Sequence, residues 1–332
     1  MKKITWIRLS SKFRYGGGAF GQKARESLAG RFEIEVKDLS PKTWSWKYLK
    51  PFFWFSRLLA LRGQSHLWVR DDLFSLAALP FSRPRGKNLA VIYHIDSSVF
   101  PLLLRLPFFL LEKMAYWGLR KTDAILTISE YWQNYFLKKG YKNVFKIYPA
   151  FDLLSDFNVS ESETAAFKKK YGLEEKPIVY LGNCQKAKGV VEAREALQGL
   201  DVYFVTSGQP QVIIDALNFN LDYADYLKML KAASLVITMS KFKEGWNMTA
   251  HEAMLLKTPV IGSGSGGMKE LLEGGKQIIC QDFNFLREKV EYLLKNPGVR
   301  KEMGENGFAF AKNFTLERFR EDWLKLAENV IK

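Results

Sequence analysis

The sequence predicts an α/β protein made of two Rossmann-like, doubly wound parallel-sheet domains that face a central cleft. Short, continuously apolar runs alternate with amphipathic helical stretches along the chain, as is typical of parallel strands buried on both faces. A polar, charge-rich segment at 155–164 interrupts this alternation, which then restarts. The 332 residues are enough for two domains with their own hydrophobic cores.

The expected strands form two groups, one on each side of the polar segment. The first group is expected at 3–9, 32–38, 66–70, 88–94 and 123–128. The second group is expected at 177–182, 201–206, 211–215, 234–239, 258–262 and 276–280. The helical stretches between the strands supply the crossover connections of doubly wound sheets. We therefore expect one domain at 1–155, a second at 156–312, and a final amphipathic helix within 313–332.

The net charge of +15 is confined to the first half of the chain. Residues 1–155 contain 26 Lys and Arg against 11 Asp and Glu, whereas residues 156–332 contain 24 of each. Two stretches of the first half, 41–62 and 100–121, interleave aromatic with basic residues. This mixture suits an anionic membrane interface, although the same stretches also fit core helices of the first domain. No nucleic-acid-binding motif accompanies them, so nucleic acid is not an expected partner.

Several chemistries and locations are not favoured by the composition. The two cysteines, Cys184 and Cys280, provide no disulfide framework, which indicates a reducing compartment. No Cys/His cluster has metal-ligand spacing, so no metal site is expected. The start of the chain is unlike a signal peptide, and the apolar block at 100–111 is broken by Arg105 and Pro107. We expect a cytoplasmic protein attached peripherally to the inner membrane face.

A glycine-rich stretch follows the first expected strand. Gly16, Gly18 and Gly21 have the G-x-G-x-x-G spacing, and Asp38 follows 17 residues after Gly21, close to the dinucleotide-binding fingerprint. However, six residues separate the expected strand end from Gly16, more than a dinucleotide turn uses. These residues leave three alternatives open: an NAD(P) site, a structural turn, or a loop that faces another phosphate.

The second half contains a pair of glutamates in E-x7-E spacing within 240–275. Glu244 follows an expected strand in a loop, whereas Glu252 lies in the first turns of the next expected helix. Between them, residues 247–249 place backbone N–H groups at a helix start, where a diphosphate binds well. His251 faces another side of this helix and is interpreted as structural. The spacing alone also fits a solvated helix face.

Segment 240–275 resembles the signature of retaining glycosyltransferases of family 4, which have the two-domain GT-B fold. The resemblance extends over most of the chain. Segment 180–197 is similar to the start of the family's donor domain, and 123–140 with 147–152 to the end of its acceptor domain. The tail at 285–319 is similar to the closing helices, whose last part crosses back to the first domain.

The resemblance implies a role for each matching residue. Glu244 would contact the transferred sugar, and His94 would lie beside it. Lys188 would bind the donor diphosphate and neutralise the leaving group. Glu252 would bind the ribose hydroxyls. The further donor-binding residues implied are Gly16, Gly17 and Gly18 of the first domain, backbone amides of Asn247, Met248 and Thr249, and Asn183 with Lys186.

Two positions depart from the family pattern. Asn183 stands where the family usually has Arg, so one phosphate-binding cation is missing, and Lys186 is the residue expected to compensate. Asn247 stands where a glycine is usual, which narrows the backbone freedom beside the sugar.

The resemblance implies metal-independent, retaining transfer of a sugar from a UDP- or GDP-linked donor to a hydroxyl of a lipid-linked or glycan acceptor. It implies no cofactor. Two alternatives remain open at this point: an NAD(P)-dependent oxidoreductase that uses the Gly16–Gly21 loop, and a catalytically weak, membrane-binding GT-B protein.

Overall fold

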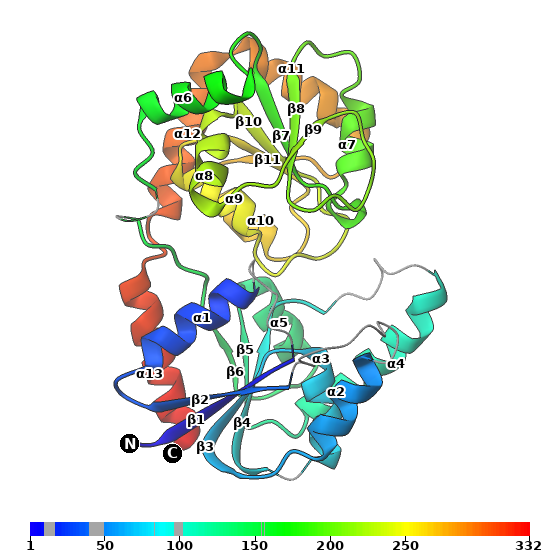
Figure 1. Ribbon diagram of the computed structural model, residues 1–332, viewed down its shortest axis with the longest axis vertical. Helices are drawn as coiled ribbons and strands as arrows, with labels where there is room; N and C mark the ends of the chain where they lie inside the picture. The colour runs from blue at the N-terminus through cyan, green and yellow to red at the C-terminus, as the bar shows by residue number, and fades with distance from the viewer. Residues whose placement is uncertain (10–16, 40–49, 83, 96–101, 154, 156) are drawn as a thin grey trace. The chain divides into compact units, whose positions relative to one another are not determined.

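The structure is a computed structural model that describes residues 1–9, 17–39, 50–82, 84–95, 102–153, 155 and 157–332. It divides into two compact units (Figure 1). The first unit comprises Met1–Ala150 and Leu316–Lys332, and the second comprises Phe151–Thr315.

The first unit is built on a six-stranded, fully parallel sheet. Its strands are Lys3–Arg8 (β1), Glu33–Asp38 (β2), Gln64–Arg70 (β3), Arg85–Ile92 (β4), Ala124–Thr127 (β5) and Val144–Lys146 (β6). They lie in the order β2-β1-β3-β4-β5-β6, which reverses direction between β1 and β3. The helices of this unit are Gly17–Leu28 (α1), Lys50–Leu59 (α2), Leu73–Ala78 (α3), Leu102–Leu119 (α4), Glu130–Lys138 (α5) and Leu316–Ile331 (α13), with a 3-10 turn at Leu79–Phe81 (η2).

The last helix, α13, belongs to the first unit because its aromatic residues pack into that unit's core. Phe319 meets Phe20 of α1 edge-on with ring centroids 5.2 Å apart, and Trp323 lies 5.7 Å from Trp6 of β1. All four side chains are buried. Burying large aromatic rings is worth several kcal/mol, which ties the end of the chain firmly to its beginning.

The second unit also contains a six-stranded parallel sheet, and its strand order is that of a Rossmann fold. The strands are Ile178–Asn183 (β7), Tyr203–Ser207 (β8), Leu217–Phe219 (β9), Leu235–Thr238 (β10), Val260–Gly262 (β11) and Ile278–Ile279 (β12). The order β12-β11-β10-β7-β8-β9 reverses between β7 and β10. The helices are Glu161–Tyr171 (α6), Val190–Ala196 (α7), Tyr223–Ala232 (α8), Met248–Leu255 (α9), Met268–Gly274 (α10), Leu286–Lys295 (α11) and Pro297–Ala311 (α12), with 3-10 turns at Lys186–Lys188 (η3) and Phe283–Phe285 (η4).

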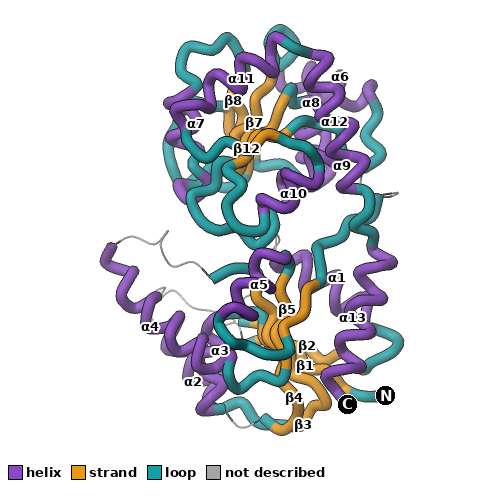
Figure 2. Tube along the Cα trace, turned by 180° about the vertical axis from the view of Figure 1, so that it is seen from behind, coloured by secondary structure: helices purple, strands orange, loops and turns teal. Residues whose placement is uncertain are grey.

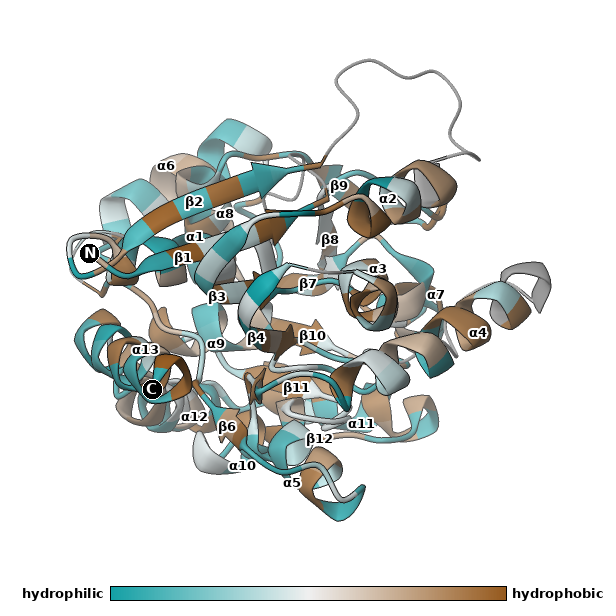
Figure 3. Cartoon of the chain, turned by 90° about the horizontal axis from the view of Figure 1, so that it is seen from below, coloured by the Kyte–Doolittle hydropathy of each residue, from teal (hydrophilic) through white to brown (hydrophobic). Residues whose placement is uncertain are grey.

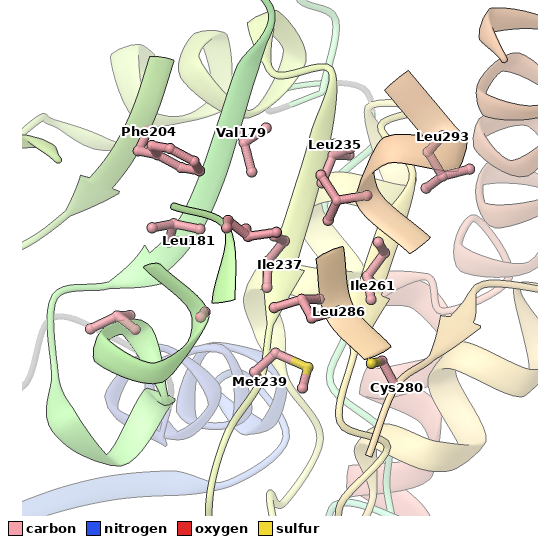
Figure 4. Packing of buried hydrophobic residues seen from close by; sticks show 14 of the residues in the cluster. Val179, Leu181, Phe204, Leu235, Ile237, Met239, Ile261, Cys280, Leu286 and Leu293 are labelled. Carbon is pink, nitrogen blue, oxygen red and sulfur yellow. The ribbon is translucent and has the colours of Figure 1, made fainter. Parts of the chain in front are cut away.

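Helices flank both sheets, as the trace in Figure 2 shows. In the second unit, Val179 of β7 and Ile237 of β10 pack with Leu286 and Leu293 of α11 (Figure 4). These strands read as unbroken apolar runs because both of their faces are covered. The expectation of two doubly wound parallel sheets is therefore confirmed.

One expected strand is wrong. Residues 211–215 form no strand, and the strand beside β8 at that edge of the second sheet is β9, at Leu217–Phe219. Val212 and Ile214 are partly buried and pack against the hydrophobic core from a loop, whereas Ile213 is fully exposed. The apolar alternation at 211–215 thus reflects burial of a loop rather than a β-ladder. Strand β6 had no matching expectation, because three residues are too few to stand out as a pattern.

Among the described residues, no helix combines the length and apolarity needed to cross a bilayer. Helix α4 is the longest apolar helix, with Pro107 inside it, and much of it is hydrophobic in Figure 3.

Candidate functional site

The predicted donor-binding residues of the second unit gather at the carboxyl ends of β7 and β10. These are the two strands between which the strand order reverses. In open α/β sheets a ligand binds outside the strand ends at this point. Turn η3, which contains Lys188, follows β7, and the loop with Glu244 follows β10 and leads into α9. The topology therefore brings together residues 56 positions apart.

Glu244 is a buried carboxylate surrounded by three hydrogen-bond donors. Lys188 Nζ lies 2.6 Å from Glu244 Oε1 and forms an ion pair with it. Ser240 donates to the same oxygen over 2.5 Å, and Asn247 Nδ2 lies 3.3 Å away. Hydrogen bonds to an ionised oxygen are roughly twice as strong as neutral ones, so this carboxylate is held in one orientation.

Two glycines allow the loops of this site to approach each other. Gly266 has φ +70°, and a Cβ built there would lie 2.4 Å from the carbonyl oxygen of Glu244. Glu244 and Gly266 form a parallel bridge, in which Gly267 donates to the Glu244 carbonyl over 2.9 Å. Gly189, also at positive φ, would place a Cβ 2.3 Å from the Met239 carbonyl oxygen. Gly189, next to Lys188, and Gly266, bridged to Glu244, thus fix the backbone positions from which those two side chains extend.

Asn247 adopts a positive-φ backbone conformation, which favours glycine. Its φ is 104°, and its side-chain oxygen accepts from Ala250 N over 2.8 Å as the N-cap of α9. The next two residues, Met248 and Thr249, begin the helix, and their N–H groups have no intrahelical acceptor. Such a helix start carries partial positive charge and favours an anion. Asn247 therefore combines three tasks: the left-handed turn, the helix cap and a contact with Glu244.

Glu252 is buried on α9, and both of its carboxylate oxygens accept from tyrosines of α8. Tyr223 OH lies 3.1 Å from Oε1, and Tyr226 OH lies 3.1 Å from Oε2. Tyr226 also lies 3.2 Å from Thr249 Oγ1. Burial, and secondly the Glu252 charge, raise the pKa of Tyr226 well above its usual value.

The residues at the end of β7 differ in their surroundings. Asn183 Oδ1 accepts from Ser207 of β8 over 2.9 Å. Ser207 in turn lies 2.7 Å from the hydroxyl of Tyr180. Lys186 is exposed at the start of η3. The side-chain oxygen of Asn183 is thus engaged by the neighbouring strand, and Lys186 is the more accessible polar group.

Two predicted groups belong to the first unit. Gly16 lies outside the described residues, whereas Gly17 and Gly18 begin α1, eight residues after β1 ends. Tyr93 donates to the Gly17 carbonyl over 2.9 Å, and a Cβ on Gly17 would meet the Tyr93 ring at 2.8 Å. Close packing therefore accounts for Gly17, and the strand-to-helix distance differs from that of a dinucleotide turn. His94 lies just beyond β4 and is exposed.

His251 is structural, as predicted. Its side chain is fully buried, Trp246 Nε1 donates to its Nδ1 over 2.9 Å, and its Nε2 lies 3.1 Å from the Ala311 carbonyl oxygen. It joins α9 to the end of α12. Among the described residues, no three His, Cys, Asp or Glu side chains gather as a possible metal site.

Sequence reasoning missed two contributors to this site, Ser240 and Tyr226. Ser240 lies four residues before Glu244, a separation that brings side chains together in a helix. Both residues lie in a loop, however, where a four-residue separation predicts no contact. Tyr226 follows Tyr223 by three residues at the start of a helix, which does place both rings on one face. That second signal was available from the sequence.

The two doubly wound parallel sheets match the GT-B fold of solved glycosyltransferase structures. The solved structure of HepE from Anabaena, in complex with UDP and glucose, matches with a TM-score of 0.77 and 16% identity. This match covers 99% of the present chain and 100% of that one.

Residues 161–310 match the family model described as glycosyl transferases group 1. This match confirms the resemblance of this segment to glycosyltransferases of that group.

Two curated relatives illustrate the range of the family. A trehalose synthase of Pyrococcus horikoshii is 36% identical over 110 residues, which are 32% of this chain and 26% of the relative. The GalNAc-alpha-(1->4)-GalNAc-alpha-(1->3)-diNAcBac-PP-undecaprenol alpha-1,4-N-acetyl-D-galactosaminyltransferase of Campylobacter jejuni is 25% identical over 176 residues, 47% of this chain and 49% of the relative. The matches thus span from about a quarter to about half of these relatives' length.

Proposed function

We propose that the protein is a retaining glycosyltransferase of family 4 that moves a sugar from a UDP- or GDP-linked donor to an acceptor hydroxyl, without a metal ion. The observation that carries this proposal is the grouping of Lys188, Glu244, Glu252 and the start of α9 at the topological switch point of a Rossmann-ordered sheet. A cation, a helix N-terminus and two carboxylates are what a nucleotide diphosphate sugar requires.

Lys188 and the amides of Met248 and Thr249 act on the donor diphosphate in this proposal. The bond between the anomeric carbon and the phosphate oxygen breaks, and negative charge develops on the leaving diphosphate. The acceptor oxygen bonds to the anomeric carbon on the same face, and its proton passes to the leaving phosphate oxygen. A positioned cation and helix dipole that stabilise such charge typically lower the barrier by about 3–4 kcal/mol.

The two carboxylates bind the remaining parts of the donor. Glu252 accepts from the ribose hydroxyls and Glu244 from hydroxyls of the transferred sugar. The family resemblance assigns His94 a contact with that sugar as well. Lys186 supplies a second phosphate contact in place of the family's usual Arg at position 183. The UDP and glucose present in the HepE structure support a donor of this class.

We propose that the acceptor is lipid-linked or a glycan, and that the first unit binds it at the anionic inner face of the cytoplasmic membrane. The whole excess of positive charge lies in the first half of the chain. Three apolar side chains of α2 and α4 are strongly exposed: Phe52 by 77%, Leu106 by 67% and Leu110 by 54%. The undecaprenol-linked substrate named for the Campylobacter relative supports a lipid-linked acceptor. Parts of the two aromatic stretches, 41–49 and 100–101, lie outside the described residues.

Proton NMR of slow donor hydrolysis tests the proposal. Incubated with a UDP- or GDP-linked α-sugar and EDTA, the protein should release the α-anomer first, because retention and metal independence both follow from the mechanism. Initial release of the β-anomer, or loss of turnover with EDTA, would overturn the corresponding part of the proposal.

A further inference from the structure

The two hydroxyls now bound to Glu252 come from the protein itself. Tyr223 donates to Oε1 and Tyr226 to Oε2, each over 3.1 Å. Both tyrosines lie on α8, three residues apart, and α8 packs beside α9. Their rings are nearly parallel, with an interplanar angle of 26° and centroids 6.2 Å apart. Glu252 therefore accepts a pair of neighbouring hydroxyl groups.

A ribose presents the same donor pattern. Its vicinal 2′ and 3′ hydroxyls can donate one hydrogen bond to each oxygen of a carboxylate, as the two tyrosines do here. A ribose on Glu252 therefore competes with the two tyrosine hydroxyls for the same carboxylate oxygens. This step rests on the proposed function, in which Glu252 binds the donor ribose.

We infer that Tyr223 is a self-ligand of Glu252: its hydroxyl occupies Oε1 in the free protein and gives way to the donor ribose. Tyr226 stays in place and acts as a positioning residue. The donor-binding site is then partly closed by its own side chain before the nucleotide arrives.

The surroundings of the two tyrosines separate their roles. Tyr223 is 44% exposed and is the first residue of α8, so its side chain has solvent beside it into which it can rotate. Tyr226 is partly buried, lies 3.2 Å from Thr249 Oγ1, and packs against the buried ring of Tyr180 with centroids 6.3 Å apart. The high pKa of Tyr226 keeps its hydroxyl protonated as a donor.

The inference has a consequence opposite to that of an ordinary binding residue. Removing the Tyr223 hydroxyl removes a competitor for Oε1, so nucleotide affinity should rise. A net hydrogen bond corresponds to a change of about three- to tenfold in affinity. Removing the Tyr226 hydroxyl should lower affinity, because Glu252 loses the contact that orients it.

Isothermal titration calorimetry of the full chain with UDP, GDP and ADP tests the inference. Tyr223→Phe should bind about three- to tenfold more tightly than wild type to each nucleotide that wild type binds. The gain in affinity should not depend on the base, since all three nucleotides share the ribose. Tyr226→Phe should bind more weakly. Tyr292→Phe, at an exposed tyrosine of α11, is the matched control and should bind like wild type.

The Glu252→Ala variant separates failure of the inference from failure of the proposed function. If binding is lost in Glu252→Ala but is unchanged or weaker in Tyr223→Phe, the self-ligand inference is overturned and the donor site stands. A gain confined to one base also overturns it. If Glu252→Ala binds like wild type, or if no nucleotide binds to wild type or Tyr223→Phe, both the donor site and the inference are overturned.

Discussion

At the scale of single residues, the ion pair between Lys188 and Glu244 is the central charged contact of the site. Lys188 is the more exposed partner, and its Nζ also lies 4.9 Å from the Phe242 ring centroid. An ammonium held by a buried carboxylate and an aromatic face is oriented before the diphosphate arrives. Such pre-organisation is the main source of electrostatic catalysis.

Lys188→Met should lower the rate of sugar release from the donor by about 100- to 1,000-fold, because the leaving diphosphate loses its cation. The measurement is single-turnover kinetics of nucleotide release at saturating donor. Lys241→Met is the control, since Lys241 makes a comparable ion pair, with Glu192, and follows β10 as well. A rate within threefold of wild type for a folded Lys188→Met variant would remove this lysine from the mechanism.

Residue-level reasoning from the sequence found the charged groups but not their supports. The E-x7-E spacing identified Glu244 and Glu252, and the resemblance identified Lys188. Asn247 was expected to restrict the backbone, and it instead adopts the left-handed conformation and caps α9. Side chains can compensate for a lost glycine in this way, which residue type alone does not reveal.

At the scale of elements, two loops of the second unit approach each other so closely that one contact position must be glycine. The loop after β10 and the loop before α10 meet at the bridge between Glu244 and Gly266. Gly266 is therefore required for two independent reasons: its φ of +70° and the carbonyl oxygen 2.4 Å from where a Cβ would lie.

Gly266→Ala should destabilise the protein by about 3–5 kcal/mol, from backbone strain together with overpacking, and should displace Glu244. Gly172→Ala provides a matched control, because Gly172 ends α6 at φ +65° and a Cβ there meets nothing within 4 Å. It should cost only about 1 kcal/mol. Urea unfolding of both variants gives the comparison. Equal losses of stability would show that the close contact at Gly266 adds nothing.

The limits of sequence reasoning at this scale are visible at the edge of the second sheet. Interior strands such as β7 and β10 are buried on both sides and read as unbroken apolar runs. The segment 211–215 has a similar composition but packs as a loop. An apolar pattern indicates that a segment is buried. A strand also needs a neighbouring strand as its hydrogen-bonding partner, and that partner is known only from the fold.

At the scale of the whole molecule, the excess positive charge coincides with exposed apolar side chains in the first unit, whereas the exposed Ile213 of the second unit lies outside the basic half of the chain. The first half of the chain carries the entire net charge, and its helices α2 and α4 expose large apolar side chains. Each basic residue near an anionic leaflet contributes about 1 kcal/mol, and inserted apolar groups add to this.

Sedimentation with liposomes tests the membrane proposal. The protein should bind vesicles with about 30% anionic lipid at low salt, and binding should fall steeply at high salt because the attraction is screened. Replacing Phe52, Leu106 and Leu110 by Ser should weaken binding at least tenfold. Ile213→Ser, at a fully exposed site of the second unit, should leave it unchanged. Equal binding to neutral and anionic vesicles, or none at low salt, would contradict the proposal.

The fold class followed from strand alternation and one polar break, because both sheets are parallel and buried. The strand orders did not follow, since the first unit reverses between β1 and β3 and the second between β7 and β10. Predicted donor residues follow the strands at both reversals: Gly17 and Gly18 follow β1, and Lys188 and Glu244 follow β7 and β10. The family resemblance identified these residues, and the strand orders explain why they lie at such strand ends.

Thermal unfolding with a panel of UDP-, GDP- and dTDP-sugars, beside NAD(H) and NADP(H), tests the central claim that the second unit binds a nucleotide sugar. A ligand at about 100 times its Kd adds roughly 2.7 kcal/mol, worth several degrees in Tm. We expect a shift with one class of nucleotide sugar that is lost in Glu252→Ala and kept in Glu273→Ala, whose carboxylate is exposed on α10. A shift with NAD(H) alone, no shift with any nucleotide sugar, or an equal shift in Glu252→Ala would contradict the claim.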